Sequence, residues 1–181
     1  MKWKILGGTT LWLLISILGC GVSLSQPPFA VTSSAFSSGA VIPAEYACTG
    51  DNRSPALSWE GAPSNTAAFA LIAEDPDAPG GIFIHWVVFD LPGSEKSLAA
   101  GISRSGTISS GGRQGVNSFG RIGYDGPCPP RGQVHHYHFR LLALDAPIGA
   151  HLSGQTNAAA VEAAAAGHIL ATAEMIGTFN R

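Results

Sequence analysis

Four short segments combine side chains that can bind ligands or carry protons with prolines that stiffen the chain. They are residues 75–79 (Asp-Pro-Asp-Ala-Pro), 85–86 (His-Trp), 123–130 (Gly-Tyr-Asp-Gly-Pro-Cys-Pro-Pro) and 135–137 (His-His-Tyr). Because proline fixes φ and removes a backbone donor, we expect the first and third segments to form rigid loops at strand ends. A rigid loop that carries Asp beside strands that carry His can shape a small polar pocket.

The strands that must position these groups are indicated by apolar runs bounded by Gly and Pro. Residues 67–73 and 82–89 are continuous apolar stretches of strand length, and residues 135–144 alternate before they become apolar. Such runs predict a β-rich domain whose central strands are covered on both faces. There is no internal repeat or heptad pattern.

Strand alternation predicts how the polar side chains are distributed. His85 is expected to share a face with residues 87 and 89 and to point away from Trp86, while His135 and Tyr137 share a face opposite His136. Asp75 follows the 67–73 run. If the strands are neighbours, Asp75, His85, His135 and Tyr137 can converge on one cavity.

One helix and one further strand are predicted near the end of the chain. Residues 158–166 are dominated by alanine, with Thr156 or Asn157 as the N-cap and Gly167 as the C-cap. Residues 169–179 alternate like a strand. Residues 101–122 are rich in Gly and Ser, and we expect a long connection there that is functional or mobile.

These segments, in this order, resemble the phosphatidylethanolamine-binding protein (PEBP) family, in particular its bacterial, Raf-kinase-inhibitor-like branch. The resemblance runs from about residue 29 to residue 181 and includes residues 54–59 (Ser-Pro-Ala-Leu-Ser-Trp) and 141–145 (Leu-Leu-Ala-Leu-Asp). The family often reads His-Arg-Tyr where this chain has His135-His136-Tyr137. The resemblance implies a mainly β sandwich with a large central sheet, a smaller sheet and one Ala-rich helix, whereas strand periodicity alone supports only a β-rich fold.

The resemblance also implies an anion-accepting pocket. In the family, the residues at the positions of Asp75, His85, His135 and Tyr137 line that pocket, and the turn from residue 126 to 130 forms another wall. We add Trp86 as a supporting residue. The expected ligand-binding residues are therefore Asp75, His85, Trp86, Gly126, Cys128, Pro130, His135 and Tyr137. Histidine donates one hydrogen bond when neutral and two when protonated, so phosphate or a phosphoethanolamine-like group is the expected ligand, with no cofactor.

Two other kinds of site were weighed. Asp with His can orient a general base, so a hydrolase acting on a phosphoester is the alternative function. There is no Gly-x-Ser-x-Gly motif and no motif fixes a serine beside a histidine, which favours a binding module over an enzyme. Residues 135–138 are rich in histidine, but only His136 and His138 share a strand face and a third ligand would be needed, so no metal site is predicted.

The N-terminus has the pattern of an export signal. Lys2 and Lys4 precede a mostly apolar stretch at residues 5–18, and residues 17–20 (Ile-Leu-Gly-Cys) resemble a bacterial lipobox. We expect residues 1–19 to be a lipoprotein signal peptide, Cys20 to receive the lipid, residues 20–28 to be a tether and residues 29–181 to form the domain. This predicts a lipoprotein of the bacterial cell envelope, or a periplasmic protein if an ordinary signal is cleaved elsewhere.

Composition limits the partners of the mature chain. Removal of residues 1–19 leaves 162 residues, about one domain, with 8 basic and 12 acidic residues and a net charge of −4. This charge disfavours nucleic acid and anionic membrane surfaces as partners of the domain, so membrane association is expected through Cys20; the oligomeric state is open. Cys48 and Cys128 can form a disulfide in an oxidising compartment, but free thiols are the alternative, since both stand where the bacterial family often has cysteine, even in cytoplasmic members.

Overall fold

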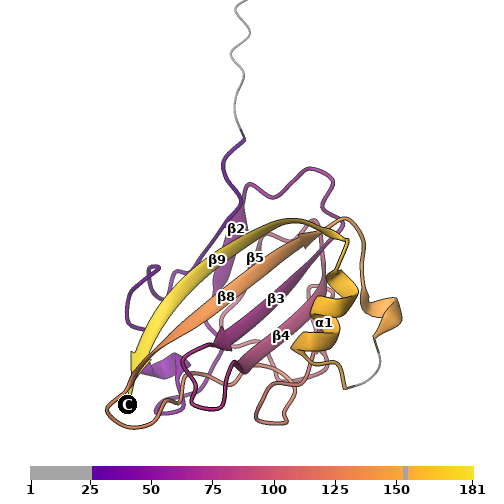
Figure 1. The fold of residues 1–181 in the computed structure, drawn as a ribbon. Helices are drawn as coiled ribbons and strands as arrows, with labels where there is room; N and C mark the ends of the chain where they lie inside the picture. Colours follow the sequence, from indigo (N-terminus) through magenta and orange to yellow (C-terminus); the bar gives the residue numbers. More distant parts are fainter. Residues whose placement is uncertain (1–25, 153–154) are drawn as a thin grey trace, which may run out of the picture.

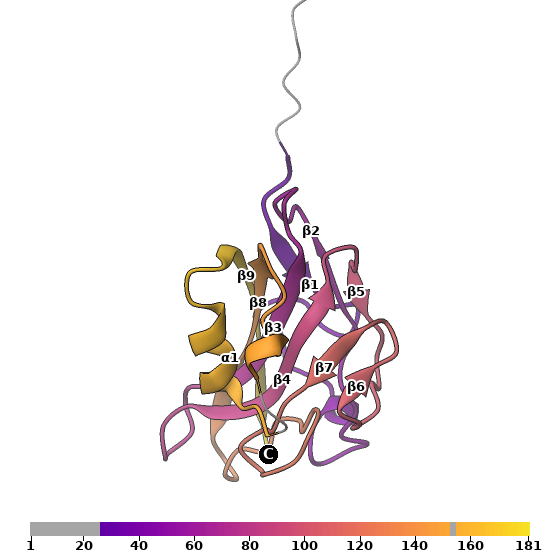
Figure 2. The same ribbon diagram turned by 90° about the vertical axis from the view of Figure 1, so that its right-hand side faces the viewer.

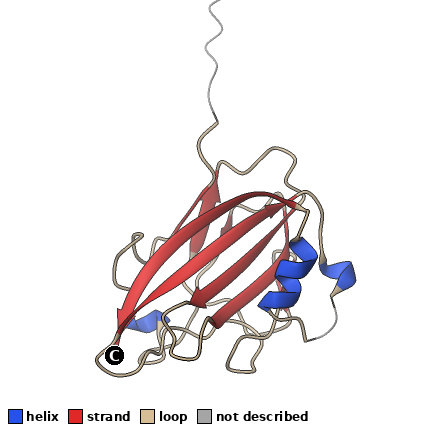
Figure 3. Cartoon of the chain, in the orientation of Figure 1, coloured by secondary structure: helices blue, strands red, loops and turns tan. Residues whose placement is uncertain are grey.

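The computed structural model describes residues 26–152 and 155–181, and most of the regular structure is β (Figures 1 and 3). The signal peptide and Cys20 predictions, and most of the tether, lie outside the described residues. The elements in chain order are β1 (Ala30–Thr32), η1 (Ala44–Tyr46), β2 (Leu57–Glu60), β3 (Ala68–Asp75), β4 (Phe83–Pro92), β5 (Ser97–Leu98), β6 (Thr107–Ile108), β7 (Gly112–Gln114), β8 (Val134–Leu144), η2 (Gly149–His151), α1 (Ala158–Ala165) and β9 (Ile169–Asn180).

The strands form two sheets. The large sheet has six strands in the order β6-β7-β4-β3-β8-β9, and the small sheet has three in the order β1-β2-β5. Each strand pair is antiparallel. Figure 2 shows the small sheet on one side of the large sheet and α1 on the other. The predicted β-sandwich with a large central sheet, a smaller sheet and one Ala-rich helix is therefore confirmed.

Two apolar cores explain why the central strands are apolar on both faces. The core between the sheets contains Phe69, Leu71, Phe139 and Leu141. The core beneath α1 contains Ala70 and Ile72 of β3 together with residues of β4, β8 and the helix. Alternate residues of a strand enter opposite cores, and so a strand buried on both faces is a continuous apolar run.

The helix follows the sequence signals closely. Asn157 is the N-cap, and its side chain accepts a hydrogen bond from the backbone N–H of Ala160 at 3.0 Å. The helix ends at Ala165, and Gly167 two residues later has φ +86°, a left-handed conformation that glycine adopts without strain. Among the described residues, no helix is long and apolar enough to cross a membrane.

The region predicted as a long connection, residues 101–122, contains β6 and β7 as a hairpin that extends the sheet beside β4. Gln114 anchors it: its side-chain oxygen accepts from the Trp86 indole at 2.8 Å, and its amide donates to the carbonyls of Ser103 and Ser105 at 2.7 Å. Buried polar partners, rather than apolar periodicity, hold this segment, which is why the sequence pattern did not reveal the two strands.

Candidate functional site

The Asp-Pro-Asp loop leads from β3 to β4 and hydrogen-bonds to β8 where β3 and β8 cease to pair. The Asp75 carboxylate accepts from the Nδ1–H of His135 at 2.7 Å and from the backbone N–H of Asp77 at 2.9 Å. Asp77 in turn accepts from the backbone N–H and from Nδ1 of His136, at 2.8 and 2.7 Å. The hydrogen bonds from His136 lower the pKa of Asp77. Two consecutive histidines on opposite strand faces are thus each held by one aspartate of the loop.

A β-bulge directs His85 to the same side of the sheet. Ala73 pairs with Trp86 and Glu74 pairs with Ile84, so His85 is an extra residue between two regular pairs. A bulge of this kind turns two successive side chains toward one face. The His85 ring contacts the Tyr137 ring edge to face with a centroid distance of 5.2 Å, which confirms the shared face. The expected grouping of His85 with residues 87 and 89 was wrong, because alternation is interrupted at the bulge.

The third predicted segment fixes the ring of His85. Nδ1 of His85 lies 2.6 Å from the carbonyl oxygen of Asp125, and the Asp125 N–H donates to the His85 carbonyl at 3.0 Å. A carbonyl oxygen can only accept, so Nδ1 carries the proton and Nε2 is left for another partner. Burial lowers the pKa of His85, although the Asp125 carbonyl and the charge of Asp75 act in the opposite direction.

Asp125 itself is a buried structural anchor. Arg121 binds its two carboxylate oxygens at 2.9 and 2.7 Å, Asn117 donates at 2.8 Å and Arg104 lies at 2.9 Å. Burial alone would raise the pKa of this carboxyl, but the hydrogen bonds from Arg121, Asn117 and Asn52 and the charge of Arg104 lower it overall. This network ties the 101–122 region to the loop that holds His85. The sequence pattern does not reveal this network, although Asp125 stands within the 123–130 motif.

Tyr137 lies behind the histidines. Its side chain is buried, and its hydroxyl is the one buried side-chain nitrogen or oxygen of the described residues that lacks a hydrogen-bond partner. Burial and the nearby charge of Asp75 raise its pKa, so the hydroxyl is a neutral donor. Buried polar groups without a partner are rare, and the groups nearest to this hydroxyl are the Asp75 carboxylate and the backbone of Cys128.

These groups surround a cavity of about 250 Å³ at the end of the large sheet where β3 ends and β4 and β8 begin. Five of the eight predicted ligand-binding residues line it, namely Asp75, His85, Cys128, Pro130 and His135. The remaining lining residues are Ala78, Pro79, Phe83, Phe119 and Pro129. Phe119 is 40% exposed, so one side of the mouth is apolar.

Three predicted ligand residues, Trp86, Gly126 and Tyr137, do not line this cavity. Trp86 is fully buried in the core between the sheets, where its indole bonds to Gln114, so it supports the fold beside the bulge rather than the cavity surface. Gly126 is buried in the loop wall, and a Cβ there would lie 2.0 Å from the carbonyl oxygen of Tyr46. Glycine is required at this position for close backbone approach.

Cys48 and Cys128 are joined by a disulfide with a Cα–Cα distance of 5.4 Å. The bond connects the segment after η1 to the cavity wall. The backbone N–H of Cys48 also donates to the carbonyl of Pro127 at 3.0 Å, and the Tyr124 hydroxyl donates to the carbonyl of Tyr46 at 2.7 Å. The wall is therefore held by covalent and hydrogen-bonded contacts.

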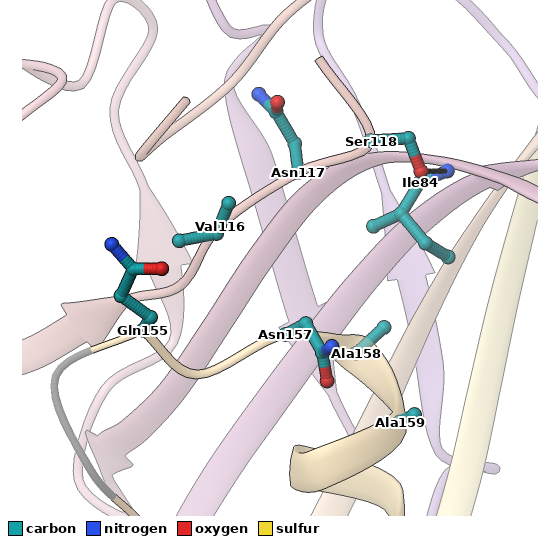
Figure 4. Close-up of a pocket in the computed structure, with 8 residues that line it drawn as sticks. All are labelled: Ile84, Val116, Asn117, Ser118, Gln155, Asn157, Ala158 and Ala159. Atoms are coloured by element: carbon teal, nitrogen blue, oxygen red, sulfur yellow. Dashed lines mark hydrogen bonds between the residues drawn. The ribbon is translucent and has the colours of Figure 1, made fainter. Parts of the chain in front are cut away.

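A second cavity, of about 360 Å³, lies between Ile84, the 116–118 segment and the start of α1 (Figure 4). Its Ser118 hydroxyl accepts from the Ile84 N–H at 2.9 Å, and its Asn157 caps the helix. These polar groups have structural partners, and none of the ligand-binding residues predicted from the sequence lies there. In the part of the chain that is described, no group of three or more His, Cys, Asp or Glu residues could hold a metal ion.

Comparison with known proteins gives a consistent result. The family model described as phosphatidylethanolamine-binding protein matches residues 32–180. A "UPF0098 protein" of Methanothermobacter thermautotrophicus is 42% identical over 147 residues, which cover 81% of this chain and 95% of that protein. "Putative lipoprotein LppC" of Mycobacterium tuberculosis is 41% identical over 159 residues, 84% of this chain and 73% of that protein.

Among solved structures, Escherichia coli YbcL is similar over 86% of this chain and 99% of its own, with a TM-score of 0.78 and 34% sequence identity. YbcL is described as a member of the mammalian PEBP family.

Proposed function

Because the chain belongs to the phosphatidylethanolamine-binding protein family, we propose that it is a binding module that holds a phosphate or a phosphorylated headgroup beside Asp75, His85 and His135. The observation that supports this most directly is the convergence of these three side chains on one cavity from three neighbouring strands. Each is at least 95% buried, so their positions are set by packing rather than by solvent.

His85 provides the first ligand contact. Its Nδ1–H is committed to the Asp125 carbonyl, and burial favours the neutral ring. Nε2 then accepts a hydrogen bond from a protonated phosphate oxygen, or donates one after it takes up that proton. In both cases the complex holds a proton between nitrogen and phosphate oxygen, so affinity should fall as pH rises above about 7.

Asp75 adds a negatively charged group to the pocket. Its carboxylate orients His135 through Nδ1 and retains lone pairs, since a carboxylate has about four acceptor positions. A phosphoethanolamine-like group brings both an anionic phosphate and an ammonium donor. Such a group would satisfy the histidines and the carboxylate together.

We favour binding over hydrolysis on the composition of the cavity. Among the described residues that line it there is no serine or threonine, and Cys128 is engaged in a disulfide. Ser118, which lies in the Gly- and Ser-rich region, accepts a hydrogen bond from the backbone N–H of Ile84. Without a nucleophilic side chain, the Asp–His pair could act on a phosphoester only as a general base for water, and not through a covalent intermediate.

We place this binding activity at the cell envelope. The proposal rests on the lipobox-like residues 17–20 and on the similarity to a relative whose name describes a lipoprotein.

Isothermal titration calorimetry of the purified mature chain with inorganic phosphate and with phosphoethanolamine tests the function. We expect saturable binding that is weaker at pH 8 than at pH 6, and that is weakened in His85→Ala. Absence of binding by the wild-type protein would refute the proposal. Turnover of a phosphoester that is lost in His85→Ala would replace it with the hydrolase alternative.

A further inference from the structure

The cavity has no cation of its own apart from histidine. Its lining contains the Asp75 carboxylate and two imidazoles, and among the described residues neither arginine nor lysine lines it. A phosphate dianion beside a buried carboxylate is costly unless a further positive charge compensates it. Arg181 can supply that charge.

The register of β8 and β9 puts Arg181 on the cavity side of the sheet. His135 pairs with Phe179 and Val134 with Asn180, so the next residues in line are Gln133 and Arg181. The backbone N–H of Gly132 donates to the Arg181 carbonyl at 2.9 Å, which continues this alignment past the end of the strand. Because alternate residues share a face, Arg181 follows the buried Phe179 toward the side on which His135 lies.

The side-chain contacts of Arg181 are weak ones. Its Nη1 lies 3.3 Å from Sγ of Cys128 and 3.9 Å from Sγ of Cys48. Disulfide sulfur is a poor hydrogen-bond acceptor, and within residues 26–152 and 155–181 no carboxylate pairs with this guanidinium. Cys128 is itself a lining residue, so the guanidinium lies one side chain away from the cavity.

A side-chain contact links His135 to the residue that is aligned with Arg181. Gln133, the residue aligned with Arg181, places its side-chain oxygen 3.2 Å from Nε2 of His135. The polar series from Asp75 through His135 to Gln133 therefore ends at the backbone position that is aligned with Arg181.

From this geometry we infer that Arg181 is a specificity-determining residue that turns from the disulfide and binds the outer oxygens of a phosphate whose inner oxygens contact His85 and His135. The inference rests on the proposed function and assigns the charge that the cavity lacks. A tetrahedral phosphate has oxygens for both the histidines and the guanidinium fork, whereas the two oxygens of acetate cannot serve both. Arg181 therefore selects phosphate over carboxylate.

The test compares inorganic phosphate and acetate by calorimetry on the mature chain with its disulfide intact. Arg181→Gln should weaken phosphate binding about tenfold, the loss of one charge-assisted contact, and change acetate binding little. Arg181→Lys keeps the charge but not the fork and should recover part of the lost affinity. Lys96→Gln removes one positive charge from an exposed site outside the cavity and should leave both affinities unchanged.

The outcomes separate the two proposals. Wild-type phosphate affinity in Arg181→Gln, together with a loss in His135→Ala, would remove Arg181 from the site and leave the binding function standing. Equal losses in Arg181→Gln and Lys96→Gln, or equal losses for phosphate and acetate, would reduce Arg181 to a general field effect and overturn the inference. Failure of the wild-type chain to bind phosphate would overturn both.

Discussion

Asp75 and His135 are joined by a 2.7 Å hydrogen bond between Oδ2 and Nδ1 at the point where β3 leaves β8. The last paired residues of these strands are Glu74 and His138. Beyond this pair the strands are joined by the side-chain hydrogen bond and no longer by the backbone ladder. Both side chains are at least 95% buried. The hydrogen bond that links the ends of the two strands therefore also orients a histidine that lines the cavity, so the same pair serves the fold and the proposed ligand site.

His135→Ala should weaken the binding of phosphate and phosphoethanolamine by about 10- to 150-fold, the loss of one charge-assisted hydrogen bond worth roughly 1.5–3 kcal/mol. Calorimetric titration measures the affinity, and circular dichroism checks that the fold is retained. His168→Ala is the matched control, because His168 is exposed and pairs with Asp145 outside the cavity. Equal affinity in wild type and His135→Ala would leave His135 with a structural role only.

The sequence predicted the elements well because apolar period and capping residues are local signals. The three central strands and the helix with its Asn157 cap lie within a few residues of their expected bounds. Their packing into two sheets came from the resemblance, since alternation cannot specify which strands are neighbours.

The site was predicted less completely, and the reason is the bulge. The sequence does not show that His85 is an extra residue opposite Ala73, so strict alternation set His85 apart from Trp86. In the structure both face the core side, where Trp86 fills the interior and His85 reaches the cavity. Asp125 could have been identified from its motif, but its arginine and asparagine partners come from segments with no shared pattern.

The disulfide makes a second prediction. Thiol titration of the unfolded, unreduced mature domain should find no free sulfhydryl at Cys48 or Cys128. The bond closes a loop over a sequence separation of 80 residues, for which chain entropy gives about 4.5 kcal/mol of stabilisation, often less in practice.

Urea unfolding of the Cys48→Ala/Cys128→Ala variant should accordingly show a clearly lower midpoint. Two free thiols in the wild-type protein would mean instead that Cys48 and Cys128 stand where the bacterial family often has cysteine but form no disulfide. An unchanged midpoint would show that the bonds of Tyr124 and Cys48 to the neighbouring backbone suffice to hold the wall.

The third prediction concerns Cys20. Full-length protein expressed in a bacterial host should partition with membranes and incorporate a fatty-acid analogue, because Cys20 closes the apolar N-terminal segment after a small glycine. Cys20→Ser should release the protein or leave its signal peptide uncleaved. Lack of label on the wild-type chain would favour an ordinary secretory signal.

The fourth prediction is a pH dependence of stability caused by His85. Burial lowers the folded-state pKa of His85, whereas the unfolded chain should have the ordinary value of about 6.5. Below pH 6.5 the unfolded state thus binds a proton that the folded state resists. The contribution of His85 to stability is present above pH 6.5 and is lost as pH falls toward the folded pKa.

Urea unfolding at a series of pH values from 7.5 to 5 measures this contribution. His85→Gln retains an amide donor for the Asp125 carbonyl but does not titrate, so its free energy of unfolding should fall less steeply over this range than that of the wild type. His168→Gln is the comparison for replacing an exposed histidine outside the cavity. The same slope in wild type and His85→Gln would mean that His85 accepts a proton in the folded protein as readily as in the unfolded chain. The bulge and the Asp125 carbonyl would then not maintain the neutral ring.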